Sequence, residues 1–249
     1  MRKRDKILIF CLTGLLIISF IWFYFFFLEE NITSFEEKLI TAGQESEVVL
    51  IFNSGGWGTT PFESAIDFNP IINEIKELIE NQGLRVSIVE YYRTRENIIG
   101  KIGSIREIIR GFPSSSKSFA MVVEDFLEDN PDKMVIIAGL SNGASFANSA
   151  IEKISSNGEN VISIEVGTPF WKSKTEGENI LEIKNQDDIL ANGQIGSLIF
   201  SLFRAPFVWT YENIRGNHIS FSEAMNISGH NYHWEEVKEE IGVFIKERI

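Results

Sequence analysis

Residues Met134 to Ala147 read MVIIAGLSNGASFA, and this stretch decides the fold. Its first five residues are an apolar run typical of a buried strand, and small, helix-tolerant residues follow Gly143. Between the two lies the pattern G-x-S-x-G, with Ser141 at its centre. A serine on such a tight strand-to-helix turn presents its hydroxyl at the carboxyl end of the sheet. The glycines on either side remove side chains that would clash as strand and helix close on each other.

Apolar strand-like segments alternate with amphipathic helical segments along the rest of the chain. Besides the strand before Ser141, the sequence predicts strands at Val48–Phe52, Val86–Tyr91, Val161–Val166 and Ile180–Ile183, and a further one at Phe207–Tyr211. Helical spacing of apolar residues predicts helices at Pro70–Gln82, Asn97–Ile109, Ala120–Leu127 and Trp234–Ile249. This alternation predicts an α/β fold, a mostly parallel sheet flanked by helices.

The composition argues against several classes of protein. The chain has 249 residues and a formal net charge of −12, and a surface of that sign repels a phosphate backbone. Nucleic acid is therefore not an expected partner. The single cysteine, Cys11, allows neither an intrachain disulfide nor a cysteine metal cluster, and no motif indicates a cofactor.

The N-terminus carries a candidate membrane segment. Residues 7–28 contain no charge, and 22 residues span a hydrocarbon core of ~30 Å as a helix. Basic residues in the tail at 1–6 favour a cytoplasmic N-terminus and an extracytoplasmic remainder. The run ends in aromatic residues, which suits a signal anchor at a membrane interface better than a cleaved signal peptide. Residues 29–46 are predicted to form a stalk or an amphipathic lead-in, and residues 47–249 the folded domain.

A glycine-rich loop, Asn53 to Gly58, follows the first predicted strand. It lacks the glycine and lysine spacing of phosphate-binding loops. It can instead offer the backbone N–H of Gly56 or Trp57 to a developing oxyanion, beside the N–H of Asn142 that opens the helix after Ser141. A plain flexible turn is the alternative.

A serine hydroxyl needs a general base, and the base needs an orienting acid. Asp187 and Asp188 follow the strand Ile180–Ile183, at the sheet edge where Ser141 is expected. Either carboxylate could orient the base, and the sequence slightly favours Asp187. A solvated acidic turn is the alternative for both.

The base is expected to be His230. Gly229 precedes it and lets its loop approach the nucleophile closely. His233 and His218 are weaker candidates, the first because it lies where the last helix begins and the second because it lies in a polar loop.

The order serine, aspartate, histidine on alternating strands and loops resembles the α/β-hydrolase superfamily. The likeness covers roughly residues 47–249 and rests on Gly139–Gly143, on the Asp187–Asp188 loop and on Gly229–His230. It implies an esterase-like or lipase-like serine hydrolase that cleaves carboxylic esters or related acyl bonds through an acyl-enzyme on Ser141. Many members have histidine where this chain has Ser54, and two early strands are not recognised, so a trimmed form of the fold is expected.

The apolar segment Ile195–Trp209 is predicted to be either a lid or acyl-binding wall, or a core helix before the last strand. The expected partner is a small-molecule or lipid-like acyl ester. Two other functions stay open: a non-catalytic binding or scaffold protein of the same fold, and a peptidase or acyltransferase.

Overall fold

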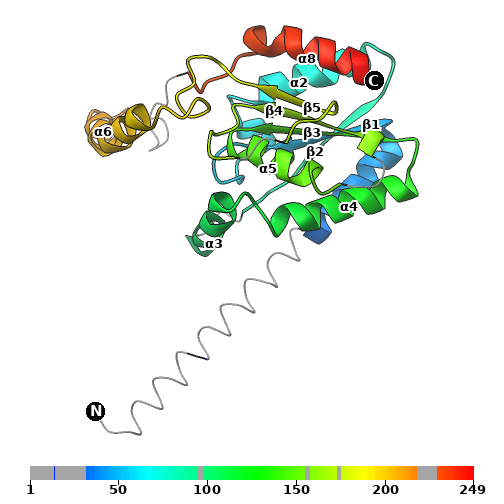
Figure 1. Cartoon of the computed structure of the whole chain (residues 1–249), viewed down its shortest axis with the longest axis horizontal. Coiled ribbons are helices and arrows are strands. Elements are labelled where there is room, and N and C mark those ends of the chain that lie inside the picture. The colour runs from blue at the N-terminus through cyan, green and yellow to red at the C-terminus, as the bar shows by residue number, and fades with distance from the viewer. Residues whose placement is uncertain (1–13, 15–31, 95–97, 155–157, 173–174, 218–228) are drawn as a thin grey trace, which may run out of the picture.

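A parallel sheet forms the centre of the chain (Figure 1). The computed structural model describes residue 14 and residues 32–94, 98–154, 158–172, 175–217 and 229–249. The sheet has five strands in the order β2-β1-β3-β4-β5, and every pairing is parallel. The strands are β1 (Val48–Asn53), β2 (Val86–Glu90), β3 (Met134–Leu140), β4 (Val161–Val166) and β5 (Ile180–Ile183). This arrangement confirms the predicted α/β class with a mostly parallel sheet.

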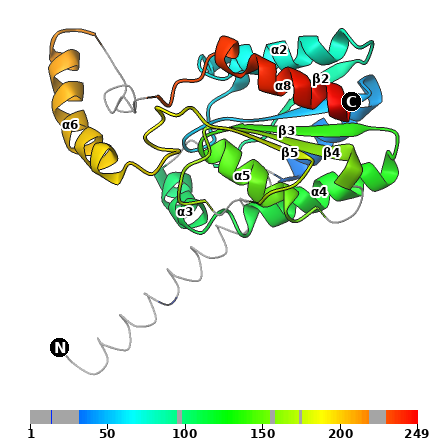
Figure 2. The ribbon, with the colours of Figure 1, turned by 45° about the horizontal axis from the view of Figure 1, so that its top comes forward.

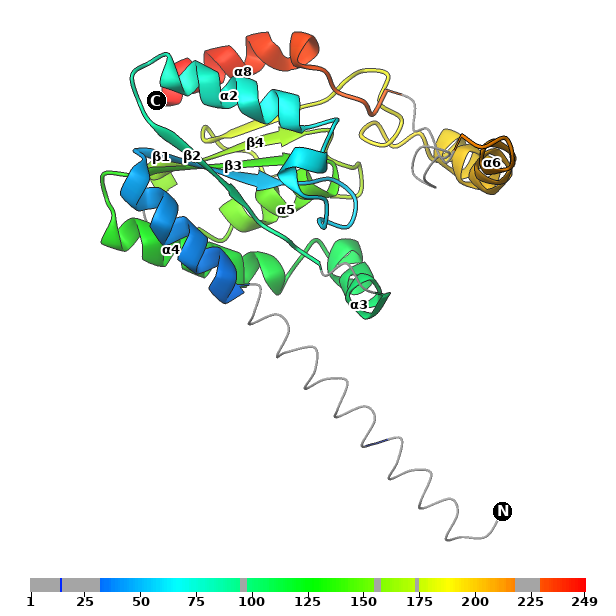
Figure 3. The ribbon, with the colours of Figure 1, turned by 180° about the vertical axis from the view of Figure 1, so that it is seen from behind.

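Helices cover both faces of the sheet because the strands are apolar on both sides. One face packs against α2 (Asn69–Glu80) and α8 (Trp234–Arg248), the other against α4 (Ser115–Asp129) and α5 (Asn142–Ile151). Along β1, Val48, Leu50 and Phe52 belong to the first core, whereas Val49 and Ile51 belong to the second. Figure 3 shows the two helical layers from behind.

Residues 32–45 differ from the predicted stalk. They form a helix whose side chains Phe35 and Leu39 are 2% and 0% exposed and belong to the core that contains α4 and α5. The rings of Phe35 and Phe119 stack at 4.9 Å between centroids. The amphipathic alternative is therefore the correct one, because an apolar stripe on this helix has a sheet face to cover.

The segment at 195–214 contradicts the predicted sixth strand. It forms α6 (Ile195–Ile214), which stands away from the layered body (Figures 1 and 2). Aromatic and β-branched residues at Phe207–Tyr211 suggested a strand, but the spacing of Phe200, Phe203 and Phe207 fits one face of a helix. These three side chains are 67%, 72% and 77% exposed, so the predicted core position is wrong as well.

The remaining described elements are α3 (Ile98–Ile109) and two short 3₁₀ helices, Phe62–Ser64 and Gly158–Asn160. The predicted membrane segment at 7–28 lies, apart from Gly14, outside the described residues. Within the described ranges, no helix is both long enough and apolar enough to cross a bilayer.

Candidate active site

Ser141 lies on a strained turn between β3 and α5. Its φ of 55° and ψ of −118° are backbone angles that L-residues rarely adopt and that cost about 1–3 kcal/mol. The residue stands at the N-cap of α5, yet its side chain makes no capping hydrogen bond. Its N–H donates to the carbonyl of Val166 at 2.8 Å, which ties the turn to the end of β4. The turn thus holds a serine hydroxyl at the carboxyl edge of the sheet without using it structurally.

Two glycines allow this turn to close. A Cβ on Gly139 would lie 2.4 Å from the Gly143 carbonyl carbon, and a Cβ on Gly143 would lie 2.3 Å from the Asn53 carbonyl oxygen. Both distances are far shorter than any real van der Waals contact of a Cβ. The sequence pattern therefore has the steric reason that was expected for it, and Gly143 also brings α5 against the loop after β1.

The carboxylate of Asp188 contacts the imidazole of His230. Asp188 Oδ2 lies 2.8 Å from His230 Nδ1, and the side chains are 0% and 15% exposed. A carboxylate has no proton to donate, so Nδ1 carries the hydrogen and Nε2 is left as the basic nitrogen. This is the tautomer that a general base next to a serine requires.

Asp187, which the sequence slightly favoured, is not the residue that meets His230. Its own N–H donates to the Asn185 side chain at 3.0 Å, and its residue is exposed. Asp188 instead turns inward, where its Oδ1 accepts hydrogen bonds from the N–H groups of Leu190 and Ala191 at 2.9 and 3.0 Å. The amides that follow Asp188 decide which of the two neighbours becomes the buried acid.

The imidazole of His230 lies over the end of β4, between the strand that carries Ser141 and the strand that precedes Asp188. A Cβ on Gly167, which directly follows β4, would lie 3.2 Å from His230 Cε1. The N–H of Gly167 donates to Ile183 at the end of β5 at 2.9 Å, so the strand ends are aligned. Gly229, with φ of 72°, brings the histidine loop so close that a Cβ there would lie 2.2 Å from the Asp187 carbonyl oxygen.

Tyr232 completes the environment of the acid. Its hydroxyl donates to Asp188 Oδ2 at 2.7 Å and accepts from the N–H of Asn185 at 3.1 Å. Burial alone would raise the pKa of Asp188, but hydrogen bonds from His230, Tyr232 and the Ala191 N–H outweigh burial and hold that pKa below its usual range. Asp188 is therefore an anion at neutral pH.

The loop after β1 lies beside Asn142, as the oxyanion hypothesis requires. The Asn142 side-chain amide donates to the Gly56 carbonyl at 3.2 Å. Gly56 has φ of 54° and belongs to a turn that is closed by a 3.0 Å hydrogen bond from the Gly58 N–H to the Gly55 carbonyl. Trp57 lies in the same turn with a side chain that is 40% exposed. The N–H of Asn142 starts α5, where helical N–H groups have no intrahelical acceptor.

The other histidines lie elsewhere. His233 is the N-cap residue of α8, and its N–H donates to the side chain of Glu236 at 3.5 Å. His218 lies outside the described residues. Of the histidines that the structure describes, His230 is the one bonded to an acid of the candidate site.

A second buried acid lies between β4 and α5. Glu165, on β4, accepts hydrogen bonds from the Asn148 amide and from the Ser163 hydroxyl, at 3.1–3.2 and 2.9 Å. Burial raises its pKa to about 8, so it is protonated at neutral pH. Neither Glu165 nor Tyr232 was among the residues predicted for the site. For Tyr232 the signal was its place two residues after His230; a single glutamate within an apolar strand was the signal for Glu165.

No protein-family model matches the sequence, and no curated protein matches it either. Among solved structures, the chain is similar to a Trichoderma reesei cutinase that was solved with a phosphonate inhibitor. The TM-score is 0.52 with 9% sequence identity, and the match covers 88% of this chain and 89% of the cutinase. At this identity the likeness concerns the fold, and it supports the expected hydrolase-like arrangement of a parallel sheet between helices.

Proposed function

We propose that this chain is a serine hydrolase of carboxylic esters, with Ser141 as nucleophile, His230 as general base and Asp188 as orienting acid. The observation that carries the proposal is the 2.8 Å contact between Asp188 and His230 at the sheet edge where Ser141 occupies its strained turn. The three residues follow or overlie the ends of β3, β4 and β5, which are neighbours in the sheet. A purely structural aspartate–histidine pair gives no reason for a strained serine turn at the same edge of the sheet.

The proposed reaction has two halves. His230 Nε2 takes the Ser141 proton as Oγ attacks the ester carbonyl carbon, and the same proton then goes to the alkoxide that leaves as an alcohol. Water attacks the acyl-enzyme in the second half, again with His230 as base, and the carboxylic acid leaves. The N–H groups of Asn142 and of Gly56 or Trp57 are the proposed donors to the oxyanion in both halves.

The proposed substrate is a small or lipid-like acyl ester. The exposed aromatic side chains of Trp57, Phe170 and Trp171 belong to loops that follow β1 and β4, at the same edge as Ser141. Apolar side chains there favour an acyl chain over a charged substrate. We further propose that residues 7–28 anchor the chain and that the catalytic domain faces the extracytoplasmic side, as the basic tail at 1–6 predicts.

A fluorophosphonate probe tests the proposed nucleophile directly. The cutinase of similar fold was solved with a phosphonate inhibitor, which supports the choice of a probe of this chemical class. We expect labelling of the folded protein that is lost in Ser141→Ala and falls at least 100-fold in rate in His230→Ala. Asp188→Asn is expected to slow labelling at least 100-fold, whereas its neighbour variant Asp187→Asn serves as the matched control and keeps the wild-type rate. Folded wild-type protein that is not labelled would contradict the proposal and favour the scaffold alternative.

A series of p-nitrophenyl esters of increasing acyl length then defines the substrate. Release of one equivalent of nitrophenol in a burst indicates an acyl-enzyme. Acyl transfer to an added alcohol in excess of hydrolysis would favour an acyltransferase. Cleavage of peptides without any hydrolysis of the esters would favour a peptidase. Protease accessibility of the domain in intact cells tests the orientation, and protection from added protease would contradict the extracytoplasmic assignment.

A further inference from the structure

Arg93 is a buried cation next to the candidate oxyanion loop. It follows β2, and the residue is 8% exposed. Its guanidinium carbon lies 5.3 Å from the ring centroid of Phe112 and 5.9 Å from that of Phe146. Aromatic rings at these distances stabilise a cation without neutralising its charge.

The guanidinium holds backbone carbonyls from both sides of the candidate site. One terminal nitrogen donates to the carbonyl of Ser54 at 2.5 Å and lies 3.4 Å from that of Gly55. The other donates to the carbonyl of Asn142 at 3.0 Å. Arg93 therefore clamps the loop after β1 to the first turn of α5. Gly58 makes room for it, because a Cβ there would lie 2.6 Å from Arg93 Nε.

These contacts fix the direction of an adjacent N–H. In a trans peptide the carbonyl and the following N–H point in opposite directions. The Gly55 carbonyl faces the Gly58 N–H and the guanidinium, so the Gly56 N–H is directed away from Arg93. None of the backbone hydrogen bonds between described residues uses that N–H. A cation on the carbonyl of a peptide group also makes its N–H a stronger donor, since hydrogen bonds in a chain polarise one another.

The burial of Arg93 carries a cost that packing does not explain. Burial lowers the pKa of its guanidinium to about 9, and no ion pair among the described residues joins it to a carboxylate. Its Nε is buried without a hydrogen-bond partner within the same residues. A positive charge that is desolvated and not neutralised is favourable where negative charge develops during a reaction.

We propose that Arg93 is a positioning residue of the oxyanion hole: it orients and polarises the peptide group of Gly55 and Gly56 and places an unneutralised cation behind the site. The inference rests on the proposed hydrolase function. It assigns Gly56, of the two loop candidates, as the second oxyanion donor. The expected consequence is a contribution to kcat with little contribution to KM, because the oxyanion exists only in the transition state and the intermediate.

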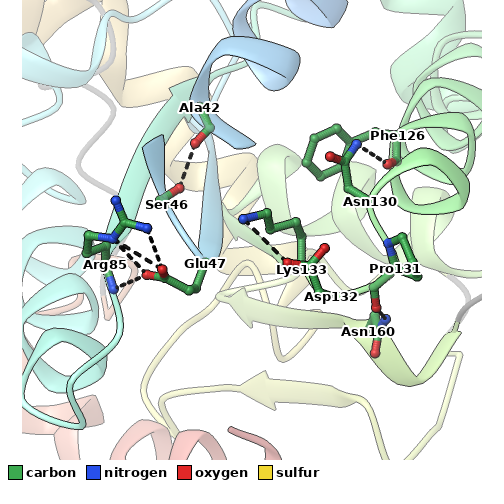
Figure 4. Close-up of polar contacts among 10 residues, drawn as sticks. All are labelled: Ala42, Ser46, Glu47, Arg85, Phe126, Asn130, Pro131, Asp132, Lys133 and Asn160. Atoms are coloured by element: carbon green, nitrogen blue, oxygen red, sulfur yellow. Dashed lines mark hydrogen bonds and ion pairs between the residues drawn. The ribbon is translucent and has the colours of Figure 1, made fainter. Parts of the chain in front are cut away.

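The test compares Arg93→Met, Arg93→Lys and the matched control Arg85→Met in hydrolysis of p-nitrophenyl butyrate. Arg85 pairs with Glu47 where β1 and β2 begin, at the opposite edge of the sheet (Figure 4). We expect Arg93→Met to lower kcat about 100-fold with KM within threefold, in line with loss of an oxyanion donor. Arg85→Met is expected to keep both constants within twofold. Unfolding temperatures identify variants that are folded at the assay temperature.

Arg93→Lys separates positioning from a merely structural role. A buried ammonium has a lowered pKa, so the kcat of this variant is expected to fall as the pH rises from 7 to 9, while Arg93→Met has no such limb. If the wild-type protein is active, two results overturn the Arg93 inference and leave the proposed function standing. One is a folded Arg93→Met variant whose kcat equals that of the wild type, and the other is an Arg93→Lys variant whose kcat does not fall between pH 7 and 9. Wild-type protein that neither labels with fluorophosphonate nor hydrolyses the ester overturns the proposed function together with it.

Discussion

Replacement of Tyr232 by phenylalanine tests whether the Asp188 carboxylate is stabilised by the hydrogen bonds that surround it. The hydroxyl makes one of four hydrogen bonds to the Asp188 carboxylate and also accepts from the Asn185 N–H. A hydrogen bond to a charged group contributes about 1.5–3 kcal/mol, and the half-buried N–H that loses its acceptor adds about 1 kcal/mol. Tyr232→Phe is thus expected to lower the free energy of unfolding by about 3 kcal/mol at pH 7.

The assay is thermal unfolding by circular dichroism, at several pH values. A loss of about 3 kcal/mol corresponds to a fall in Tm of roughly 6–12 °C for a domain of this size. The folded pKa of Asp188 lies below its unfolded value, so its stabilising hydrogen bonds contribute fully above the unfolded pKa of about 3.9. They are lost as the pH falls through the folded pKa, and the difference between variant and wild type should shrink in acid.

Tyr92→Phe is the matched control. The Tyr92 hydroxyl also donates to a carboxylate at 2.7 Å, that of Glu90, but both side chains are only half-buried. Solvent replaces such a bond, so a loss below about 1 kcal/mol is expected. A Tyr232→Phe protein that unfolds within 2 °C of the wild type at pH 7 would refute the reasoning about Asp188.

Three further predictions follow from burial and backbone geometry. Gly229→Ala should lower kcat at least tenfold and Tm by several degrees, because its Cβ would clash with the backbone of Asp187 and Asp188. Gly83→Ala is the control: Gly83 has φ of 90° and no atom near its added Cβ, so this variant measures the cost of the backbone angle alone. The pKa of Glu165 is about 8 in the folded protein, well above that of a glutamate in the unfolded chain. The free energy of unfolding of the wild type should therefore fall by up to ~1.4 kcal/mol per pH unit between pH 5 and 8. Glu165→Gln should flatten that dependence in urea unfolding series. Phe207→Ser should change the free energy of unfolding by less than about 0.5 kcal/mol, whereas Phe119→Ala should cost about 3–5 kcal/mol, and equal losses in urea titrations would contradict the exposed position of α6.

The sheet and the turn at Ser141 could be predicted from the sequence because both depend on local pattern. Apolar runs that are buried on both faces define β1, β3 and β4, and the glycines around Ser141 are required by contacts within one strand-turn-helix unit. The acid could not be assigned in this way. Asp187 and Asp188 are neighbours after the same strand, and the choice depends on amides and a tyrosine that only the folded loop brings together.

Two other features could not be predicted from local sequence pattern, for a different reason. The burial of Arg93 depends on two phenylalanines from distant segments, so one arginine in a polar loop carried no signal. The residues of α6 are as apolar as a core helix, and composition alone does not say whether the sheet has a face left to receive them. In this chain the faces are already covered by α2 and α8 and by α4, α5 and the helix at 32–45.

Among the described residues, the hydrogen bonds that hold the Asp188 and His230 side chains involve no residue of α6, which has a consequence for how this protein can diversify. Asp188 accepts hydrogen bonds from the two amides that follow it and from the Tyr232 hydroxyl, and His230 is bonded to the Asp188 carboxylate. About forty residues that include α6 separate Asp188 from His230 in the chain. Exchange of α6 for another segment leaves these hydrogen bonds of Asp188 and His230 in place. The sequence of α6 can therefore change across generations while the pairing of Asp188 with His230 stays as it is.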